Sequence, residues 1–313
     1  MPMKLLETSA NSKARIYKEF NMTPRGISRD VAALKEWLAK QPHLPIIRGE
    51  HVDQWLENYL ISNKNSLERA KEGLDCYFSV RVLVPEVFTM RDPLLEAVQK
   101  SFEVMGVIIL PKLTPEGRRV IMFSHLTPSA EDFDATVMLK RISMMMDLML
   151  QEGVDYVGID VVVDSKHVVF SHLARYNLSI LRKTFDLGWK GYPQRVNKIH
   201  VVNPWAMVET GIALFKPLLT SKLQNRIMVH RNVKDLHRHI PKHVLPEDLG
   251  GDELSVWELN SLWREKMEEY RDWFLSNEKI KTDEAKRVGK CSFESVTESA
   301  FGNSGSFRKI EVD

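Results

Sequence analysis

Carboxylates and histidines follow one another closely in one stretch of this sequence. Asp160 and Asp164 lie in the run GIDVVVD, and His167 and His172 come soon after it. Such side chains bind divalent metals or transfer protons in hydrolases. However, Asp164 opens the turn sequence Asp-Ser-Lys, and aspartates at strand ends commonly cap or pair. We therefore expect no catalytic or metal site here, and a metal-dependent hydrolase is the remote alternative.

A second group of histidines lies nearer the C-terminus, at His237, His239 and His243. Their neighbours are mostly basic: Arg231, Lys234, Arg238 and Lys242. Zinc sites usually combine two ligands three to five residues apart on one helix with a second ligand pair elsewhere. The pattern therefore favours a basic surface over a metal centre.

Other sequence motifs of catalysis and nucleotide binding are missing. There is no GxGxxG after a strand and no GxxxxGK[ST] loop, which would cradle phosphates. There is also no GxSxG nucleophile elbow. The formal charge of the 313-residue chain is only +2, which argues against a dedicated nucleic-acid binder. We expect neither an enzyme nor a cofactor site.

Positive charge is concentrated in one segment of the chain. From Arg182 to Lys242 there are 12 Lys and Arg residues against three acids, a net charge of +9. This asymmetry predicts a basic face that meets an anionic surface. No run approaches 18 apolar residues, so any membrane contact should be peripheral. The N-terminus lacks an apolar signal sequence, and Cys76 and Cys291 are far apart, so we expect a cytosolic protein with reduced thiols.

The apolar periodicity predicts helices first and then an α/β pattern. Expected helices begin at Ser28 and span His51–Asn63 and Ser66–Val84, forming a small bundle. After Pro93 strands alternate with helices, which predicts a mixed, largely parallel sheet. Expected strands are Val104–Leu110, Arg119–Ser124, Val154–Asp164, Lys198–Asn203 and Arg226–His230, and expected helices are Ala130–Glu152, His172–Leu187 and Glu253–Leu275.

One predicted helix, Trp205–Leu219, has an unusually apolar surface. Apolar side chains recur at helical spacing, and Pro217 should kink the helix near its end. The repeating residues are Trp205, Val208, Ile212, Phe215 and Leu219. Such a helix is normally buried, as a crossover between two parallel strands. The alternative is a movable lid whose apolar face covers a lipid pocket.

The region around this helix resembles the CRAL-TRIO lipid-binding family, which includes tocopherol transfer and retinaldehyde-binding proteins and many insect members. The matching pattern is YP-x-R-x-x-x-I-H-x-x-N at 192–203, KPLLTSKLQNRI at 216–227 and LPEDLGGD at 245–252. Residues 53–88 resemble the helical N-terminal domain of the same family. The C-terminal tail, with Phe301, Phe307 and Ile310, resembles that of insect members.

The resemblance implies an N-terminal helical domain over 1–95, a CRAL-TRIO domain over 96–252, and a C-terminal helix and tail over 253–313. It implies a monomer that carries a small hydrophobic ligand between membranes: tocopherol-, retinoid- or carotenoid-like. The protein would be cytoplasmic and transiently associated with anionic, phosphoinositide-containing membranes. A phosphoinositide-sensing membrane adaptor is the alternative.

A ligand of this kind needs an apolar cavity with one or two polar anchors. Met144, Met145, Met146 and Met149 on one helix favour such a cavity, because methionine adapts to irregular shapes. Ser143, Ser171 or Tyr176 would anchor a hydroxyl. The expected pocket consists of Ile142, Ser143, Met146, Met149, Ile159, Val161, Phe170, Leu173, Tyr176, Val201, Val208, Ile212, Phe215 and Leu219.

The resemblance also implies a headgroup site on the basic face. In the tocopherol-transfer branch, basic residues at the positions matching Arg195, Lys222 and Arg226 contact phosphoinositide headgroups, and Lys198 lies beside them. Relatives often carry basic residues where this chain has Asn58, Ile61, Asn63 and Asn197. Only Lys64 keeps a positive charge in that N-terminal segment. The sequence therefore predicts weaker or less selective headgroup binding.

Overall fold

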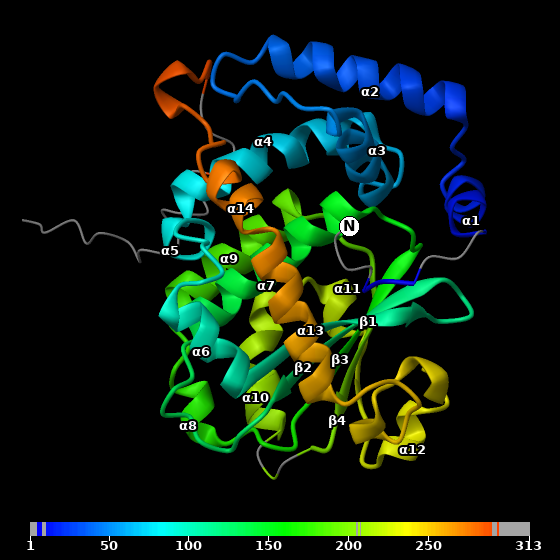
Figure 1. The fold of residues 1–313 in the computed structure, drawn as a ribbon, viewed down its shortest axis with the longest axis vertical. Helices are drawn as coiled ribbons and strands as arrows, with labels where there is room; N and C mark the ends of the chain where they lie inside the picture. The colour runs from blue at the N-terminus through cyan, green and yellow to red at the C-terminus, as the bar shows by residue number, and fades with distance from the viewer. Residues whose placement is uncertain (1–4, 8–10, 205, 207, 290–292, 294–313) are drawn as a thin grey trace, which may run out of the picture.

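The computed structural model describes residues 5–7, 11–204, 206, 208–289 and 293. Its centre is a five-stranded sheet in the order β1-β2-β3-β4-β5 (Figure 1). β1 pairs antiparallel with β2, and the three remaining pairs are parallel. The predicted α/β class with a mixed, largely parallel sheet is therefore confirmed. The strands are β1 (Met105–Leu113), β2 (Arg118–His125), β3 (Gly158–Asp164), β4 (Val196–Val202) and β5 (Ile227–Val229).

The middle strand, β3, has the sequence GIDVVVD, and its β-branched residues suit a strand with neighbours on both sides. Val161 lies opposite Ile121 of β2 and opposite Ile199 of β4. Residues in register across parallel strands point to the same face of a sheet. These three side chains therefore form an apolar row across one face.

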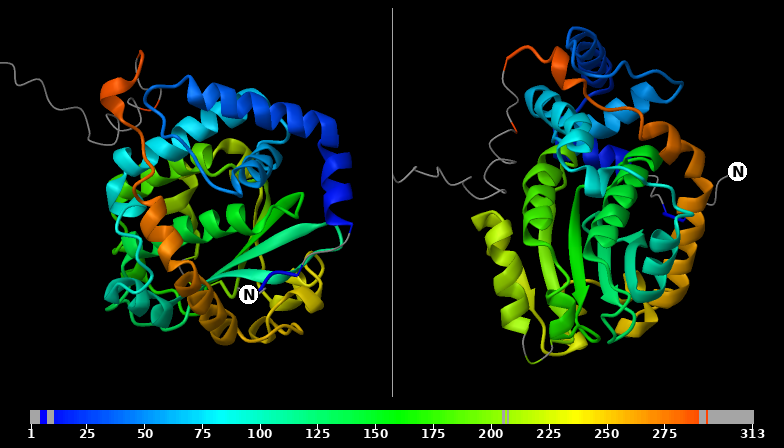
Figure 2. Two further views of the ribbon diagram at one scale, coloured as in Figure 1. Left: turned by 45° about the horizontal axis from the view of Figure 1, so that its top comes forward. Right: turned by 90° about the vertical axis from the view of Figure 1, so that its left-hand side faces the viewer.

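Helices cover the two sides of the sheet unequally. α6 (Glu96–Val104), α7 (Ala135–Glu152) and α13 (Val256–Glu269) pack against β1. α9 (Leu178–Gly191) packs against α7 and against the N-terminal helix α4. α10 (Val208–Phe215) lies at the opposite rim from α13, as the right-hand view of Figure 2 shows. α7, α9 and α10 lie on the same side of the sheet, where they enclose the cavity described below.

The N-terminal helices cover one end of the sheet, at the top of Figure 1. Ser66 caps α4 by accepting a hydrogen bond from the Arg69 backbone N–H, as its sequence position predicts. The predicted helix start at Ser28 was wrong. Thr23 caps that helix and Pro24 is its first residue, a favoured pair at a helix start. These helices are α1 (Ser12–Glu19), α2 (Pro24–Ala39), α3 (Val52–Ser62), α4 (Leu67–Leu83) and α5 (Pro85–Phe88).

Other helix boundaries also differ from the predicted ones because of local capping. The expected helix His172–Leu187 is divided into α8 (Phe170–Leu173) and α9. The division occurs because the Asn177 side chain caps α9 by accepting hydrogen bonds from the backbone N–H groups of Ser179 and Ile180. Asp134 caps α7 in the same way, so that helix begins later than Ala130. The expected C-terminal helix breaks at Tyr270 into α13 and α14 (Arg271–Asn277).

Short elements complete the chain: η1 (Lys216–Leu218), α11 (Ser221–Gln224), α12 (Val233–Leu236), η2 (Lys242–Val244), η3 (Glu247–Leu249) and η4 (Glu284–Lys286). η1 contains Pro217, and α10 ends at Phe215, just before it, so the helix stops there and does not continue through a kink. Trp205, at the expected start of that helix, and Phe301, Phe307 and Ile310 of the tail lie outside the described residues. The domain boundaries at 95 and 252 stay a prediction.

Candidate ligand-binding cavity

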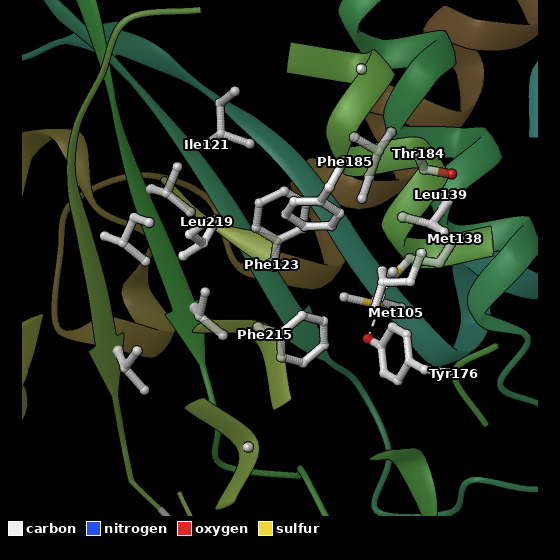
Figure 3. Close-up of a pocket in the computed structure, with 18 of the residues that line it drawn as sticks. Met105, Ile121, Phe123, Met138, Leu139, Tyr176, Thr184, Phe185, Phe215 and Leu219 are labelled. Carbon is white, nitrogen blue, oxygen red and sulfur yellow. Dashed lines mark hydrogen bonds between the residues drawn. The ribbon is translucent and has the colours of Figure 1, made fainter. Parts of the chain in front are cut away.

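A cavity of about 390 Å³ lies between the sheet and helices α7, α9 and α10. Figure 3 shows apolar side chains from all these layers pointing into it. The volume falls within the range of small-molecule sites. The cavity lining includes no Lys or Arg among the described residues, and Asp164 is its one acidic member there.

The sheet supplies the floor of this cavity. Ile159 and Val161 of β3 and Val201 of β4 line it, as the predicted pocket requires. Ile121, Phe123 and His125 of β2 line it too, at every second position. Sequence reasoning missed these three, although alternation along a strand is the pattern that places residues on one face.

Two helices form the wall facing the sheet. Ile142 and Ser143 of α7 line the cavity, with Met146 one helical turn after them and Met138 and Leu139 one turn before them. α9 contributes a second stripe that the sequence prediction omitted, although its spacing is helical. These residues are Leu181, Thr184, Phe185 and Gly188. Both helices therefore face the cavity with an apolar side.

α10 closes the cavity from the outside. Val208, Ile212 and Phe215 line the cavity, and Leu219 lies just beyond the helix. The Phe215 ring stands edge-on to Tyr176 with centroids 5.1 Å apart (Figure 3), a favoured aromatic geometry. No described side chain of α10 is fully buried. The contacts of this helix are therefore sparse for so apolar a sequence.

Two residues of the predicted pocket do not line the cavity. Met149 is fully buried, but it lies about one turn beyond Met146, where α7 meets α3 through the 2.8 Å bond from Asn58 Nδ2 to the Leu150 carbonyl. Phe170 is 57% exposed. It lies two residues before the buried His172, and such positions point to nearly opposite sides of a helix. Leu173 does line the cavity.

The predicted hydroxyl anchors differ in what they offer. The Ser143 hydroxyl donates to the Lys140 carbonyl at 2.7 Å, so that its donor is occupied. Among the described residues, the Tyr176 hydroxyl bonds only to the sulfur of Met138, at 3.8 Å (Figure 3). Sulfur is a weak acceptor. Tyr176 therefore keeps more hydrogen-bonding capacity toward the cavity than Ser143 does.

Asp160, Asp164 and His237, which the sequence offered as catalytic or metal-binding residues, have structural partners. Asp160 accepts from Asn197 Nδ2 at 2.9 Å and lies 3.3 Å from Arg118. Asp164 accepts from Asn203 Nδ2 at 2.9 Å. His237 Nε2 lies 2.7 Å from the Leu249 carbonyl. Within the described part of the chain, no group of three or more His, Cys, Asp or Glu residues has an arrangement suited to a metal ion.

A basic cluster lies beside the cavity: Lys64, Arg195, Lys222 and Arg226. Burial lowers the pKa of Lys64, and the positive charges of Arg195, Lys222, Arg69 and Arg226 lower it further. Lys64 therefore lies within electrostatic range of residues more than 130 positions away in the sequence. Lys222 and Arg226 lie between the cavity-lining residues Leu219 and Ile227. The structure thus joins the N-terminal helices to the basic segment near the lid.

The members of the basic cluster differ in their existing bonds. Arg195 forms a 2.5 Å ion pair with Glu19 at the end of α1. Arg226 donates to the Val196 carbonyl. Lys198 lies two residues from His200 on β4, and its charge lowers the pKa of that histidine, after burial and two other histidines.

No helix among the described residues is long and apolar enough to span a membrane. Asn58 and Asn63, two positions at which the resemblance implied arginine, have internal roles in this chain. Asn58 is buried and bonds to α7, and Asn63 Nδ2 donates to the Tyr59 carbonyl at 2.9 Å. Lys64, immediately after them, is the residue that reaches the basic cluster.

Comparison with known proteins agrees with this arrangement. Residues 103–251 match the CRAL/TRIO domain model, and residues 23–98 match the model described as Pinta-like, UBA domain. The chain is 28% identical over 242 residues to the human alpha-tocopherol transfer protein-like protein, covering 77% of this chain and 69% of that protein.

Two further matches are more limited. The SEC14 cytosolic factor of Kluyveromyces lactis is 33% identical over 92 residues, which is 29% of this chain and 30% of that protein. The crystal structure of Sfh5 superimposes with a TM-score of 0.47 and 13% identity, covering 87% of this chain and 98% of Sfh5.

Proposed function

Over residues 103–251 this chain belongs to the CRAL/TRIO domain family, and we propose that the protein binds a small hydrophobic ligand and transfers it between membranes. The observation that supports this most directly is the cavity of about 390 Å³, which is lined by apolar side chains and covered by α10. A molecule inside would lose contact with water, which favours binding of apolar ligands. A tocopherol-, retinoid- or carotenoid-like compound is the class we propose.

α10 is the proposed lid. Its inner face consists of apolar residues that border the cavity, while Glu209 and Thr210 are exposed on its outer face. The helix is bounded by Pro204 and Pro217, where the chain turns. Removing α10 from the cavity would break few buried contacts, so opening should cost less free energy than disrupting the sheet. Opening would provide the entry path for a ligand.

The basic cluster is the proposed membrane contact. Cationic side chains next to an anionic bilayer each contribute about 1 kcal/mol of binding free energy. Lys222 is exposed beside the end of the proposed lid, and Lys64 and Arg195 are its neighbours in the cluster. Docking through this surface would bring the lid to the membrane from which the ligand leaves. Phosphoinositides are the lipids whose charge suits such a cluster best.

The test begins with the protein as purified. Its organic extract should contain one dominant apolar molecule by mass spectrometry. The delipidated protein should then move that molecule from donor to acceptor vesicles at a rate proportional to protein concentration. An extract with no apolar molecule, together with no transfer of any tocopherol, retinoid or carotenoid, contradicts the proposal.

A phosphoinositide-sensing adaptor is the second candidate, because the basic cluster lies outside the cavity and does not depend on it. In that case phosphoinositide in the vesicles would increase binding of the protein without accelerating transfer. The transfer function predicts that both quantities rise together. We propose that the protein acts as a monomer in the cytoplasm, without enzymatic activity, and contacts membranes transiently.

A further inference from the structure

Two polar side chains of the cavity lining, His125 and Gln194, each have a buried nitrogen without a hydrogen-bond partner among the described residues; the Gln194 oxygen accepts from the Tyr156 hydroxyl. His125 ends β2, lines the cavity and is only 7% exposed. Its Nδ1 is buried and has no hydrogen-bond partner among the described residues. Buried polar atoms in native proteins nearly always have a partner, and each exception needs an explanation. A ligand in the cavity would provide one.

The neighbouring histidine, His172, is not available to a ligand in the same way. Its Nδ1 accepts a hydrogen bond from the Val169 backbone N–H at 3.1 Å. Nε2 therefore carries the proton and donates to the Ser129 carbonyl at 3.2 Å. Both ring nitrogens of His172 are thus occupied. Its ring lies 4.0 Å from that of His125 and helps to fix its orientation.

The other polar groups on the cavity wall are also partly occupied. Thr184 Oγ1 donates to the Ile180 carbonyl at 2.7 Å, and Ser143 Oγ donates to a carbonyl of its own helix. Tyr176 retains only its weak contact with sulfur. Phe133 lies edge-on to both His125 and Tyr176, with ring centroids 4.9 and 5.7 Å away. His125 and Tyr176 therefore both contact one aromatic ring, that of Phe133.

The charge of this region restricts the ligand. Burial, together with the nearby His172 and His167, lowers the pKa of His125 to about 3. The imidazole is therefore neutral at physiological pH and offers one donor and one acceptor. With no Lys or Arg in the described lining and the carboxylate of Asp164 present, an anionic headgroup would be buried without a counter-charge.

We propose that His125 anchors the polar group of the ligand, and that this group is a neutral hydroxyl and not a carboxylate or phosphate. A hydroxyl both donates and accepts, which matches a neutral imidazole. This inference rests on the proposed function, because it assumes that the cavity holds a hydrophobic ligand. It adds the chemical class of the ligand and identifies a specificity-determining residue.

Three retinoids with one hydrocarbon skeleton test the inference: retinol, retinyl methyl ether and retinoic acid. Their affinities for the delipidated protein can be compared by quenching of tryptophan fluorescence. The wild-type protein should prefer retinol over the ether by about threefold to tenfold, the effect of one net hydrogen bond. It should bind retinoic acid more weakly than either neutral compound, because the carboxylate must be buried or neutralised.

Variants at His125 assign the preference to this residue. His125→Phe keeps a ring of similar size and should bind retinol and the ether equally. His125→Gln retains a donor and an acceptor and should restore part of the preference for retinol. His237→Gln is the matched control, because this histidine bonds to the Leu249 carbonyl and does not line the cavity, and its preference should equal that of the wild type. An unchanged affinity for the ether shows that the cavity of each variant is intact.

The possible failures are distinguishable. If the wild-type protein binds retinoic acid as tightly as retinol, the neutral class is wrong. If His125→Phe keeps the preference for retinol, His125 is a structural residue and not the anchor. The same conclusion follows if His125→Phe also loses affinity for the ether and His125→Gln restores neither the affinity for the ether nor the preference for retinol. If the wild-type protein binds none of the three, the proposed function itself fails for ligands of this size.

Discussion

The hydroxyl of Tyr77 donates a 2.6 Å hydrogen bond to the carboxylate of Asp147. This bond joins α4 to α7, so it connects the N-terminal helices to a wall of the cavity. Arg91 donates to the second oxygen of the same carboxylate, and Arg81 lies 3.9 Å from it. Asn277 of α14 accepts from both arginines. One buried carboxylate thus organises segments that are far apart in the sequence.

Removing that carboxylate should strongly destabilise the protein. Asp147→Asn leaves two fully buried guanidinium groups without a counter-charge, which typically costs about 3–5 kcal/mol of unfolding free energy. Tyr77→Phe removes one donor and should cost about 1–3 kcal/mol. Urea denaturation measures both values. Asp53→Asn, which breaks an exposed ion pair with Lys35, is the control and should cost less than about 1 kcal/mol. Equal losses in all three variants would show that the buried network has no special role.

Charge introduced on the inner face of α10 should abolish ligand retention, whereas charge at Phe170 should not. Ile212→Asp places a carboxylate in the apolar cavity, at a cost on the order of several kcal/mol for the bound state. Phe170→Asp affects an exposed side chain that does not line the cavity. The measurement is the amount of ligand retained after gel filtration, with circular dichroism to check folding. Normal loading of a folded Ile212→Asp protein contradicts the placement of this face.

The lid should open more readily than the sheet. Backbone amides of α10 should exchange with deuterium faster than those of β3 in the ligand-free protein, because α10 has no fully buried side chain. β3 is paired on both sides and supplies the contrast. Mass spectrometry of peptic peptides resolves the two segments. Equally strong protection of both would rule out a lid that opens independently.

Neutralising the basic cluster should weaken membrane binding. The double variant Lys222→Ala/Arg226→Ala should lose about 2 kcal/mol of binding free energy for phosphoinositide vesicles, which is roughly a thirtyfold loss of affinity. The loss should shrink as salt rises, since ions screen exposed charges. Vesicle sedimentation measures it, with Lys198→Ala compared against the single Lys222→Ala variant. Parent-like binding by the double variant at low salt would show that this surface does not dock.

Acidification should destabilise the fold through buried histidines. Burial and neighbouring histidines lower the pKa of His200 to about 3, against about 6.5 in an unfolded chain. The unfolded state therefore binds a proton that the folded state does not, and stability falls as pH drops below about 6.5. From pH 7 to pH 5 the loss from His200 is at most about 2 kcal/mol.

Urea denaturation of His200→Gln at both pH values tests this contribution. Glutamine does not titrate, but it retains groups that can bond to His230, whose Nε2 lies 2.8 Å from His200 Nδ1. The variant should lose less stability on acidification than the parent does. His125 acts in the same direction and remains in both proteins, so some pH dependence should persist. An identical loss in parent and variant would exclude His200 as a source.

Local sequence determined the elements of this protein and its family. Continuous β-branched residues identify β3, and the helical repeat of Val208, Ile212 and Phe215 identifies the inner face of α10. Both patterns arise from backbone periodicity, which any tertiary arrangement must respect. Capping residues such as Asn177 and Thr23 also lie in the sequence, but they compete with nearby alternatives. Helix starts were therefore predicted less accurately than helix faces.

Tertiary structure alone decided where the cavity ends and which charges meet. Met149 continues the lining stripe of α7, yet it is excluded because α3 packs against that turn of the helix. Lys64 joins Arg195 and Lys222 because the N-terminal helices fold over one end of the sheet. The Nδ1 of His125 is buried without a partner only in the folded protein, where β2 and α8 pack together. Contacts between distant segments depend on how whole elements pack, and periodicity within one element carries no information about them.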